Sequence, residues 1–469
     1  MPQTVIVISD LHIGGEPGFR ICSDAGRTLL VEFLATVADE ARGGMDVHLV
    51  VNGDAVDFLA EEPFEVFTGD NRAATAKLQS ILQSSAAVWA QFRAVAAAGA
   101  EVTFLLGNHD LELTLPGPSR LLRETLGPGR VNLLFDNQAV DLGEVLIEHG
   151  NRYDAWNIVD HDALRRVRSA SSRRESIEQF AAPAGSKLVI DVMNDIKGQL
   201  RFVDLLKPEN DAVLPLLAAL SPVSAAQIKS VIAYQKQMRG VRFDPQQRPL
   251  DRANIADRAP DTIAEGDDPG AALANAWLAT DAGDANIGFE GNVDFLYLWR
   301  AAGNVSRRGE LLDRLYTALR HRVAAQREAF RVDRELPEYE TAARASAGRG
   351  FKLVVYGHPP LVKRVALSAT KSTYINTGTW ADLMMVPHAV LVDDRTLAIP
   401  ALMEFVTDLE HNRLDRWRRP VPTFARIEME GARLLAADVL TYSGSGRSEP
   451  VPVEMFEPVA LDGRPAEGV

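Results

Sequence analysis

The sequence predicts an α/β protein in which a mainly parallel sheet is covered by helices and a large, mostly helical insertion interrupts the sheet strands. Two observations predict this class. Short apolar runs alternate with amphipathic segments in the first part of the chain, which is typical of strand–helix–strand units. An Ala-, Leu- and Arg-rich region with helical spacing, from about residue 160 to 347, then precedes a second group of apolar runs.

The first strand–helix–strand unit is the clearest. Residues 6–8 and 49–51 are apolar runs of strand length, and a helix is expected between them from Gly26 to Arg42. The apolar residues on one face of this helix are Leu30, Phe33, Leu34, Val37 and Ala41. Gly43-Gly44 supplies a stop signal, so the two strands should be parallel with a right-handed crossover.

Later segments continue the pattern. A second helix, from Ala73 to Ala98, should lead into a strand at residues 101–106. Residues 139–147 read as a hairpin that turns at Gly143, and residues 424–440 as another around Gly431 near a sheet edge. We expect a first core part at 1–155, the insertion at 156–347, a second core part at 348–442 and a flexible tail at 443–469. Within the insertion, Asp251–Pro269 is expected to be a mobile loop.

Metal-ligating residue types follow the predicted strands at the points where the strands end. They are Asp10 and His12 after the first strand, Asp54 after the second, Asn108 and His109 after the third, and His149 and His358 after two later strands. Open α/β sheets bind ligands at the carboxyl ends of their strands. Carboxylate, imidazole and amide oxygen suit a pair of divalent first-row metal ions. The sequence therefore predicts a metal centre.

In chain order these residues resemble the motifs of the calcineurin-like metallophosphoesterase superfamily, which are D-x-H, G-D, G-N-H-(D/E), H and G-H-x-H. The resemblance implies a four-layer αββα sandwich for the core. Within the superfamily, Ser9–His12 and Asn376–Trp380 most resemble the bacterial UDP-2,3-diacylglucosamine hydrolase-like branch. That branch would favour a small nucleotide- or lipid-linked phosphate ester as substrate.

The resemblance also implies a role for each motif residue. Asp54 would bridge two divalent ions, for which Mn²⁺ is expected and Fe, Zn or Mg are alternatives. Asp10 and His12 would hold the first ion; the ligands of the second would be Asn108, His149 and His358. A hydroxide that bridges the metals would attack a phosphodiester, phosphomonoester or pyrophosphate in line.

Residues beside these ligands would act on the substrate or on the ligands themselves. His109 would stabilise the phosphoryl group or protonate the leaving oxygen. Asp110 would orient a neighbouring imidazole. Arg152, which follows the His149 motif, and Arg165 and Arg166, in a basic cluster, are candidates for binding an anionic substrate, although the cluster also fits a solvated helix face.

One motif departs from the family pattern. Gly357-His358 is followed by Pro359-Pro360, so a proline stands where the family has a second histidine, and proline has no side-chain donor. Water, His48 or His388 would have to replace it, although each histidine is better explained as an ordinary packing or surface residue. The departure leaves a rival hypothesis, a scaffold or binding protein with a partly decayed site.

Composition limits the remaining possibilities. The 469 residues carry a formal net charge of −14, which argues against a general nucleic-acid surface and disfavours a nuclease, the other alternative. Cys22 is the single cysteine, so no internal disulfide can form, and we expect a cytoplasmic protein. No apolar run is long enough to cross a bilayer. The sequence carries no signal for an oligomeric state.

Overall fold

The computed structural model describes residues 2–177, 179–207 and 327–453, together with residues 212, 213, 216, 312, 313, 315–320 and 323. The predicted loop at Asp251–Pro269 and most of the predicted insertion lie outside the described residues. Of the helices that the structure describes, none has the length and apolar character needed to span a membrane.

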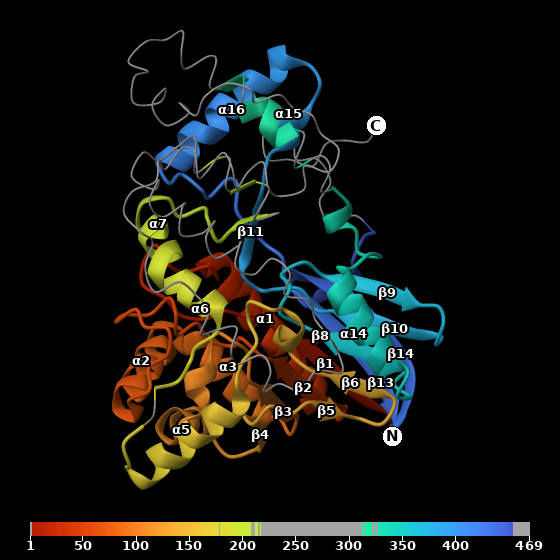
Figure 1. The fold of residues 1–469 in the computed structure, drawn as a ribbon. Coiled ribbons are helices and arrows are strands. Elements are labelled where there is room, and N and C mark those ends of the chain that lie inside the picture. Colours follow the sequence, from red (N-terminus) through yellow and green to blue (C-terminus); the bar gives the residue numbers. More distant parts are fainter. Residues whose placement is uncertain are drawn as a thin grey trace.

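Two sheets stack face to face in the lower part of Figure 1. The larger has the order β15-β14-β13-β1-β2-β3-β4 and the smaller the order β5-β6-β8-β10-β9. The larger sheet contains β1 (Gln3–Ile8), β2 (Asp46–Asn52), β3 (Glu101–Leu105), β4 (Arg130–Leu134), β13 (Thr423–Glu430), β14 (Arg433–Gly444) and β15 (Arg447–Pro450). The smaller contains β5 (Val140–Asp141), β6 (Val145–Ile147), β8 (Leu353–Tyr356), β9 (Lys363–Leu367) and β10 (Ser372–Asn376). Strands β1 to β4 are parallel, as predicted.

Alternate side chains of β1 define the layers. Val5 and Val7 pack between the two sheets, in a cluster that includes Val355 of β8. Ile6 and Ile8 point the other way, into a cluster under the helices. This division follows from the two-residue period of a strand. The outer face of the smaller sheet packs against α14 (Pro337–Ala347). The layers are therefore helices, sheet, sheet and helix, which confirms the predicted αββα class.

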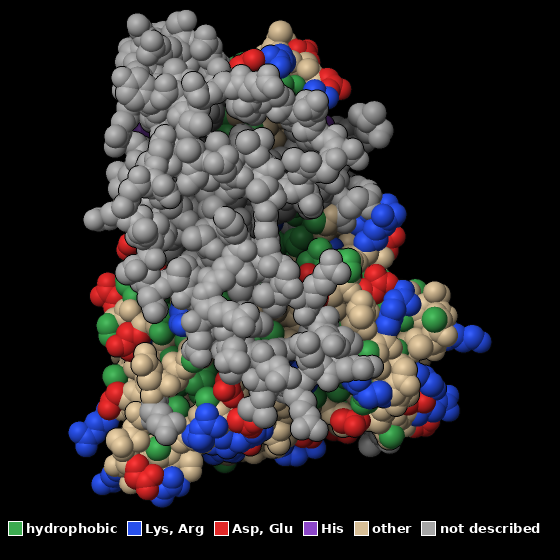
Figure 2. All heavy atoms as spheres, viewed as in Figure 1, with side chains coloured by type: hydrophobic (Ala, Val, Ile, Leu, Met, Phe, Trp, Pro, Cys, Tyr) green, Lys and Arg blue, Asp and Glu red, His purple; other side chains and the backbone are tan. Residues whose placement is uncertain are grey.

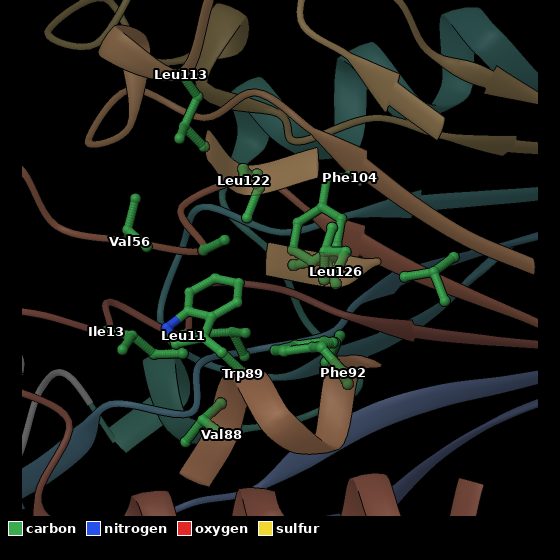
Figure 3. Packing of buried hydrophobic residues seen from close by; sticks show 14 of the residues in the cluster. Leu11, Ile13, Val56, Val88, Trp89, Phe92, Phe104, Leu113, Leu122 and Leu126 are labelled. Atoms are coloured by element: carbon green, nitrogen blue, oxygen red, sulfur yellow. The ribbon is translucent and has the colours of Figure 1, made fainter. Parts of the chain in front are cut away.

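The helices over the larger sheet are α1 (Asp24–Arg42), α2 (Asn71–Ser84), α3 (Ala86–Ala97), α4 (Pro116–Leu126), with the 3₁₀ turn η1 (Leu111–Thr114), and α5 (His161–Arg173). Helix α1 buries the predicted apolar face and is capped by Ser23. The single helix predicted from Ala73 to Ala98 is wrong, because Ser85 interrupts it. The hydroxyl of Ser85 accepts a hydrogen bond from the indole nitrogen of Trp89 at 3.0 Å. The ring of Trp89 packs in the helix-side core (Figure 3).

A second hydrophobic cluster lies beyond the sandwich, towards the top of Figure 1. Its described elements are α6 (Ala184–Leu188), the π-helical turn η3 (Val189–Met193), α7 (Asn194–Gln199), α15 (His388–Leu391), α16 (Arg395–Glu410) and a three-stranded sheet of β12 (Arg419–Pro420), β11 (Asp382–Met385) and β7 (Leu206–Lys207). This cluster joins residues 193–216 to residues 384–414. The predicted domain boundaries therefore divide the chain differently from its hydrophobic clusters.

The predicted hairpin at Gly143 forms, with β5 antiparallel to β6. The turn η2 (Asn151–Tyr153) precedes the predicted insertion, and the turn η6 (Arg327–Phe330) lies within its last part. Residues 443–450, expected to belong to a flexible tail, instead end β14 and form β15 at the edge of the larger sheet.

Candidate metal centre

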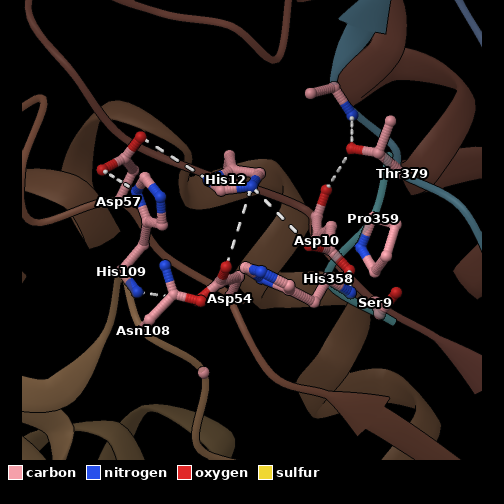
Figure 4. Close-up of polar contacts among 12 residues, drawn as sticks. Ser9, Asp10, His12, Asp54, Asp57, Asn108, His109, His358, Pro359 and Thr379 are labelled. Carbon is pink, nitrogen blue, oxygen red and sulfur yellow. Dashed lines mark hydrogen bonds and ion pairs between the residues drawn. The ribbon is translucent and has the colours of Figure 1, made fainter. Parts of the chain in front are cut away.

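The loops after β1 and β2 are paired beyond the ends of their strands. The amide of His12 donates to the carbonyl of Asp54 at 3.0 Å, and Ile13 forms a parallel bridge with Val56. Leu11, Ile13 and Val56 are anchored in the helix-side core (Figure 3). Asp10, His12 and Asp54 project instead into a shared polar centre (Figure 4).

Backbone geometry at this centre is unusual. Four of the predicted ligands have positive φ angles, which non-glycine residues rarely adopt. The values are 52° for Asp10, 44° for His12, 50° for Asp54 and 69° for His358. Such conformations cluster at functional sites, where the surrounding contacts hold them in place.

The segment after β10 supplies some of the contacts that hold Asp10 in this conformation. The hydroxyl of Thr379 donates to the carbonyl of Asp10 at 2.8 Å, and the amide of Trp380 donates to the same oxygen at 3.1 Å. The indole of Trp380 is itself fixed by a hydrogen bond to the carbonyl of Thr423. The Asn376–Trp380 segment therefore holds the backbone of the first motif.

Glycines in the motifs allow close approach of the ligands. A Cβ atom on Gly107 would lie 2.0 Å from a carboxylate oxygen of Asp54, and one on Gly53 would lie 2.4 Å from Nδ1 of His149. Real side chains do not approach so closely. A side chain at either position would displace a predicted ligand.

Two groups of donor atoms meet at Asp54. One contains Asp10, His12 and Asp54, and the other contains Asp54, His149 and His358; within each group the atoms lie within 4.8 Å of one another. Oδ2 of Asp54 is 3.3 Å from Nε2 of His149 and 4.0 Å from Nε2 of His12. Asp54 therefore stands where a bridging carboxylate would be needed.

The donor atoms fit a divalent cation. Nδ1 of His149 lies 2.7 Å from the carbonyl of Asn52 and donates to it, which leaves a lone pair on Nε2. Within the described part of the chain, this buried Nε2 and the buried Oδ1 of Asn108 have no hydrogen-bond partner. Buried polar atoms are seldom left unpaired, so a cation at the centre would satisfy both.

Charges at the centre are strongly coupled. Burial alone would raise the pKa of Asp54, but His149 and His109 hold it well below its usual range. Burial alone would lower the pKa of His149, but Asp54 and Asp10 raise it to about 9. The buried carboxylates thus favour positive charge nearby, which either protonated histidines or a bound cation can supply.

Asp57 connects two of the histidines. Its carboxylate lies 3.1 Å from Nδ1 of His109 and 3.6 Å from Nδ1 of His12 (Figure 4). Burial opposes protonation of His109, but Asp57 and Asp54 raise the pKa of His109 to about 10. The contact fixes the proton of His109 on Nδ1 and leaves Nε2 available.

Asp110 binds backbone amides. It accepts hydrogen bonds from the amides of Ala55 and Gly107, at 2.8 and 2.7 Å. Burial and the charge of Asp54 raise the pKa of Asp110 to about 8. The sequence predicted that Asp110 would orient an imidazole, whereas its hydrogen bonds join the second and third motif loops.

The two histidines considered as replacements for the missing ligand lie elsewhere. His48 is hydrogen-bonded to the hydroxyl of Thr103 at 2.8 Å and pairs in register with Glu101, at the opposite end of β2 from Asp54. Burial lowers the pKa of His48. His388 begins α15, beside the second cluster. Among the described residues, neither belongs to a group that could hold a metal.

Two of the three candidate substrate-binding arginines pair with carboxylates. Arg152 lies 3.6 Å from Glu148, and Arg165 lies 2.6 Å from Asp136. Arg166 is exposed on α5, next to Arg165 in the chain. On the face in Figure 2, the described basic and acidic side chains are interspersed.

Two polar residues missed by sequence reasoning contact the predicted ligands. Asp154 lies 3.0 Å from Nε2 of His358, and Asn157 lies 3.4 Å from Nδ2 of Asn108. From this segment the sequence singled out only Arg152, as a candidate for binding an anionic substrate. The sequence feature that could have indicated both residues is their closeness to His149 in the chain.

Comparison with known proteins identifies the first part of the chain. Residues 3–197 match the family model of the calcineurin-like phosphoesterases. The match spans less than half of the chain and shows which family this segment is similar to. The match covers β1, β2, β3 and β6 with the ligands that follow them, and ends before His358. A search of curated proteins found no match to this chain. The family indicates a phosphoesterase, a hydrolase whose members typically bind divalent metals.

Proposed function

We propose that the protein hydrolyses a phosphodiester, phosphomonoester or pyrophosphate bond with two divalent ions, for which Mn²⁺ is the first candidate. The position of Asp54 carries this proposal, because its carboxylate belongs to both groups of donor atoms. Asp10 and His12 would hold the first ion together with Asp54. The second would be held by Asp54, Asn108, His149 and His358.

The two ion positions differ in their donors. The second has four protein side chains, whereas the first has three because Pro360 stands in place of a histidine. When bound, the ions would supply Lewis-acid charge to the phosphoryl oxygens and lower the pKa of water. We expect the first ion to bind more weakly than the second.

His109 would act on the substrate. Asp57 holds a proton on Nδ1 of His109, so Nε2 is the nitrogen that remains for the substrate. The side chain of His109 is 21% exposed, whereas that of Asp57 is 5% exposed. From this position Nε2 would donate a hydrogen bond to the phosphoryl group or a proton to the leaving oxygen.

The substrate class that we propose follows from the resemblance to the UDP-2,3-diacylglucosamine hydrolase-like branch. A nucleotide- or lipid-linked phosphate ester is our first candidate. Arg152, Arg165 and Arg166 remain candidates for contacts to its anionic remainder, provided that Arg152 and Arg165 exchange their carboxylate partners for the substrate. Cytoplasmic location and a cap built from the insertion also remain predictions from the sequence.

A scaffold or binding protein is the second candidate function. Pro360 is the observation that favours it, because it removes a ligand from the first ion position. A scaffold would bind at most one ion and would not turn over esters.

Hydrolysis of a chromogenic phosphodiester and a phosphomonoester, with and without Mn²⁺, tests the proposal. Asp54→Asn and His109→Ala are compared with wild type, and bound metal is counted in each protein. We expect metal-dependent turnover by wild type, about 10²- to 10⁴-fold loss in His109→Ala, and loss of both turnover and metal in Asp54→Asn. Wild type without turnover or bound metal would support the scaffold instead.

A further inference from the structure

The loop after His149 presents a fixed carboxylate to the last ligand. Oδ1 of Asp154 accepts a hydrogen bond from the amide of Trp156 at 2.9 Å. Oδ2 accepts one from the side-chain amide of Asn157 at 2.7 Å and lies 3.0 Å from Nε2 of His358. Asp154 is therefore held in position by contacts within its own loop, independently of its contact with His358.

The contact with Asp154 decides which nitrogen of His358 carries the proton. A carboxylate only accepts hydrogen bonds, so Nε2 of His358 must donate. Nδ1 is then left with a lone pair, as metal binding requires. The other end of His358 is fixed as well, because its backbone amide donates to Oδ2 of Asp10 at 2.9 Å.

Asp154 acts on a second ligand through Asn157. Because Nδ2 of Asn157 faces Asp154, its Oδ1 is the atom that faces Asn108. Asn108 must therefore turn its Nδ2 towards Asn157, at 3.4 Å, and its Oδ1 the other way. This Oδ1 is the buried oxygen that has no partner within the described residues.

We propose that Asp154 is a positioning residue for the second ion, setting the donor atoms of His358 directly and of Asn108 through Asn157. The inference rests on the proposed metal centre. It also suits the departure in the last motif: Pro359-Pro360 adds no donor after His358, so the orientation of this single imidazole depends on a carboxylate from another loop.

Calorimetric titration of metal-free protein with Mn²⁺ tests the proposal without an activity assay. Wild type is compared with Asp154→Ala and with the isosteric Asp154→Asn. Asp162→Asn, which removes an exposed carboxylate of α5, is the control. We expect one of the two equivalents of Mn²⁺ to bind about 10- to 100-fold more weakly in Asp154→Ala. In Asp154→Asn the loss should be smaller, since an acceptor oxygen remains, and the control should match wild type.

The tautomer of His358 provides a second readout, which a purely structural role would not change. In metal-free protein labelled with ¹⁵N-histidine, wild type should show His358 protonated on Nε2, with the signal assigned by its loss in His358→Gln. Asp154→Ala, or Asp154→Asn if the alanine variant does not fold, should shift this signal towards a tautomer mixture.

The outcomes separate this inference from the proposed function. Wild-type affinity for both equivalents in the Asp154 variants, with the His358 signal unchanged, overturns this inference alone. A wild-type protein that binds no Mn²⁺ overturns the proposed function and this inference with it.

Discussion

Nε2 of His149 lies 3.3 Å from Oδ2 of Asp54, and its other ring nitrogen donates to the carbonyl of Asn52. The imidazole is therefore held with Nε2, the nitrogen that remains for a metal ion, next to a buried carboxylate. Asp54 is 1% exposed and His149 is 4% exposed, so neither group is well solvated. Their arrangement costs free energy that a cation between them would recover.

We therefore expect Mn²⁺ to stabilise the folded protein. At a free concentration one hundred times the dissociation constant, a ligand specific to the folded state contributes about 2.7 kcal/mol. Thermal unfolding should shift upwards with Mn²⁺ and return on addition of a chelator. Asp54→Asn should show no such shift, whereas Asp46→Asn, at the far end of β2, should respond as wild type does. An equal shift in both variants would contradict a site at Asp54.

Asp57→Asn should lower turnover through His109. The neutral amide no longer stabilises a proton on Nδ1 of His109, which lies 3.1 Å from the wild-type carboxylate. We expect kcat to fall about 10- to 100-fold, which is part of the contribution of a general acid. The double variant with His109→Ala should lose little more than His109→Ala alone, because the two residues act as a unit. Independent, multiplicative losses would show that Asp57 acts elsewhere, for instance through His12.

Much of the metal centre was predictable from local pattern. Polar residues that follow apolar strands converge because the carboxyl ends of parallel strands share one edge of a sheet: β1, β2 and β3 in the larger sheet, and β6 and β8 in the smaller. The loops add a second regularity, since Leu11 and Ile13 are buried in the helix-side core while Asp10 and His12 belong to the polar centre.

The break at Ser85 is a local feature that helical spacing did not indicate; the Ser85 hydroxyl accepts a hydrogen bond from Trp89, four residues on. Other features depend on contacts between distant parts of the chain. Asp154 and His358 are separated by 204 positions, so no spacing rule pairs them. The second cluster likewise joins residues 193–216 to residues 384–414. Sequence reasoning therefore named residues that the fold brings together, but it missed Asp154 and Asn157, which contact them.

Gly107→Ala should destabilise the protein even without metal. The new Cβ would lie 2.0 Å from Oδ1 and 2.5 Å from the backbone nitrogen of Asp54. Because the backbone cannot move aside as a flexible side chain does, we expect a loss of about 1–3 kcal/mol in the free energy of unfolding, as for other overpacked sites. Gly69→Ala is the matched control, since its nearest contact would be an ordinary 3.6 Å to Phe67. Urea unfolding measures both, and equal stabilities would contradict the close approach.

His161, at the start of α5, should make stability depend on pH. Burial, followed by Arg165 and Arg152, lowers the pKa of His161 to about 4, although Asp136 and Asp160 oppose the shift. In the unfolded chain a histidine has a pKa of about 6.5. Between these values the unfolded state binds more protons, so the free energy of unfolding falls as the pH falls.

The contribution of His161 is fully present above pH 6.5 and is lost progressively towards pH 4. Its size is up to about 3 kcal/mol, at about 1.4 kcal/mol for each unit of pKa. Urea unfolding of wild type and His161→Gln, both in chelator, should give a difference in stability that changes in this direction between pH 7 and pH 4.5. Because other histidines titrate equally in both proteins, the difference isolates His161. Parallel pH profiles for the two proteins would show that His161 is as accessible to protons in the folded state as in the unfolded one.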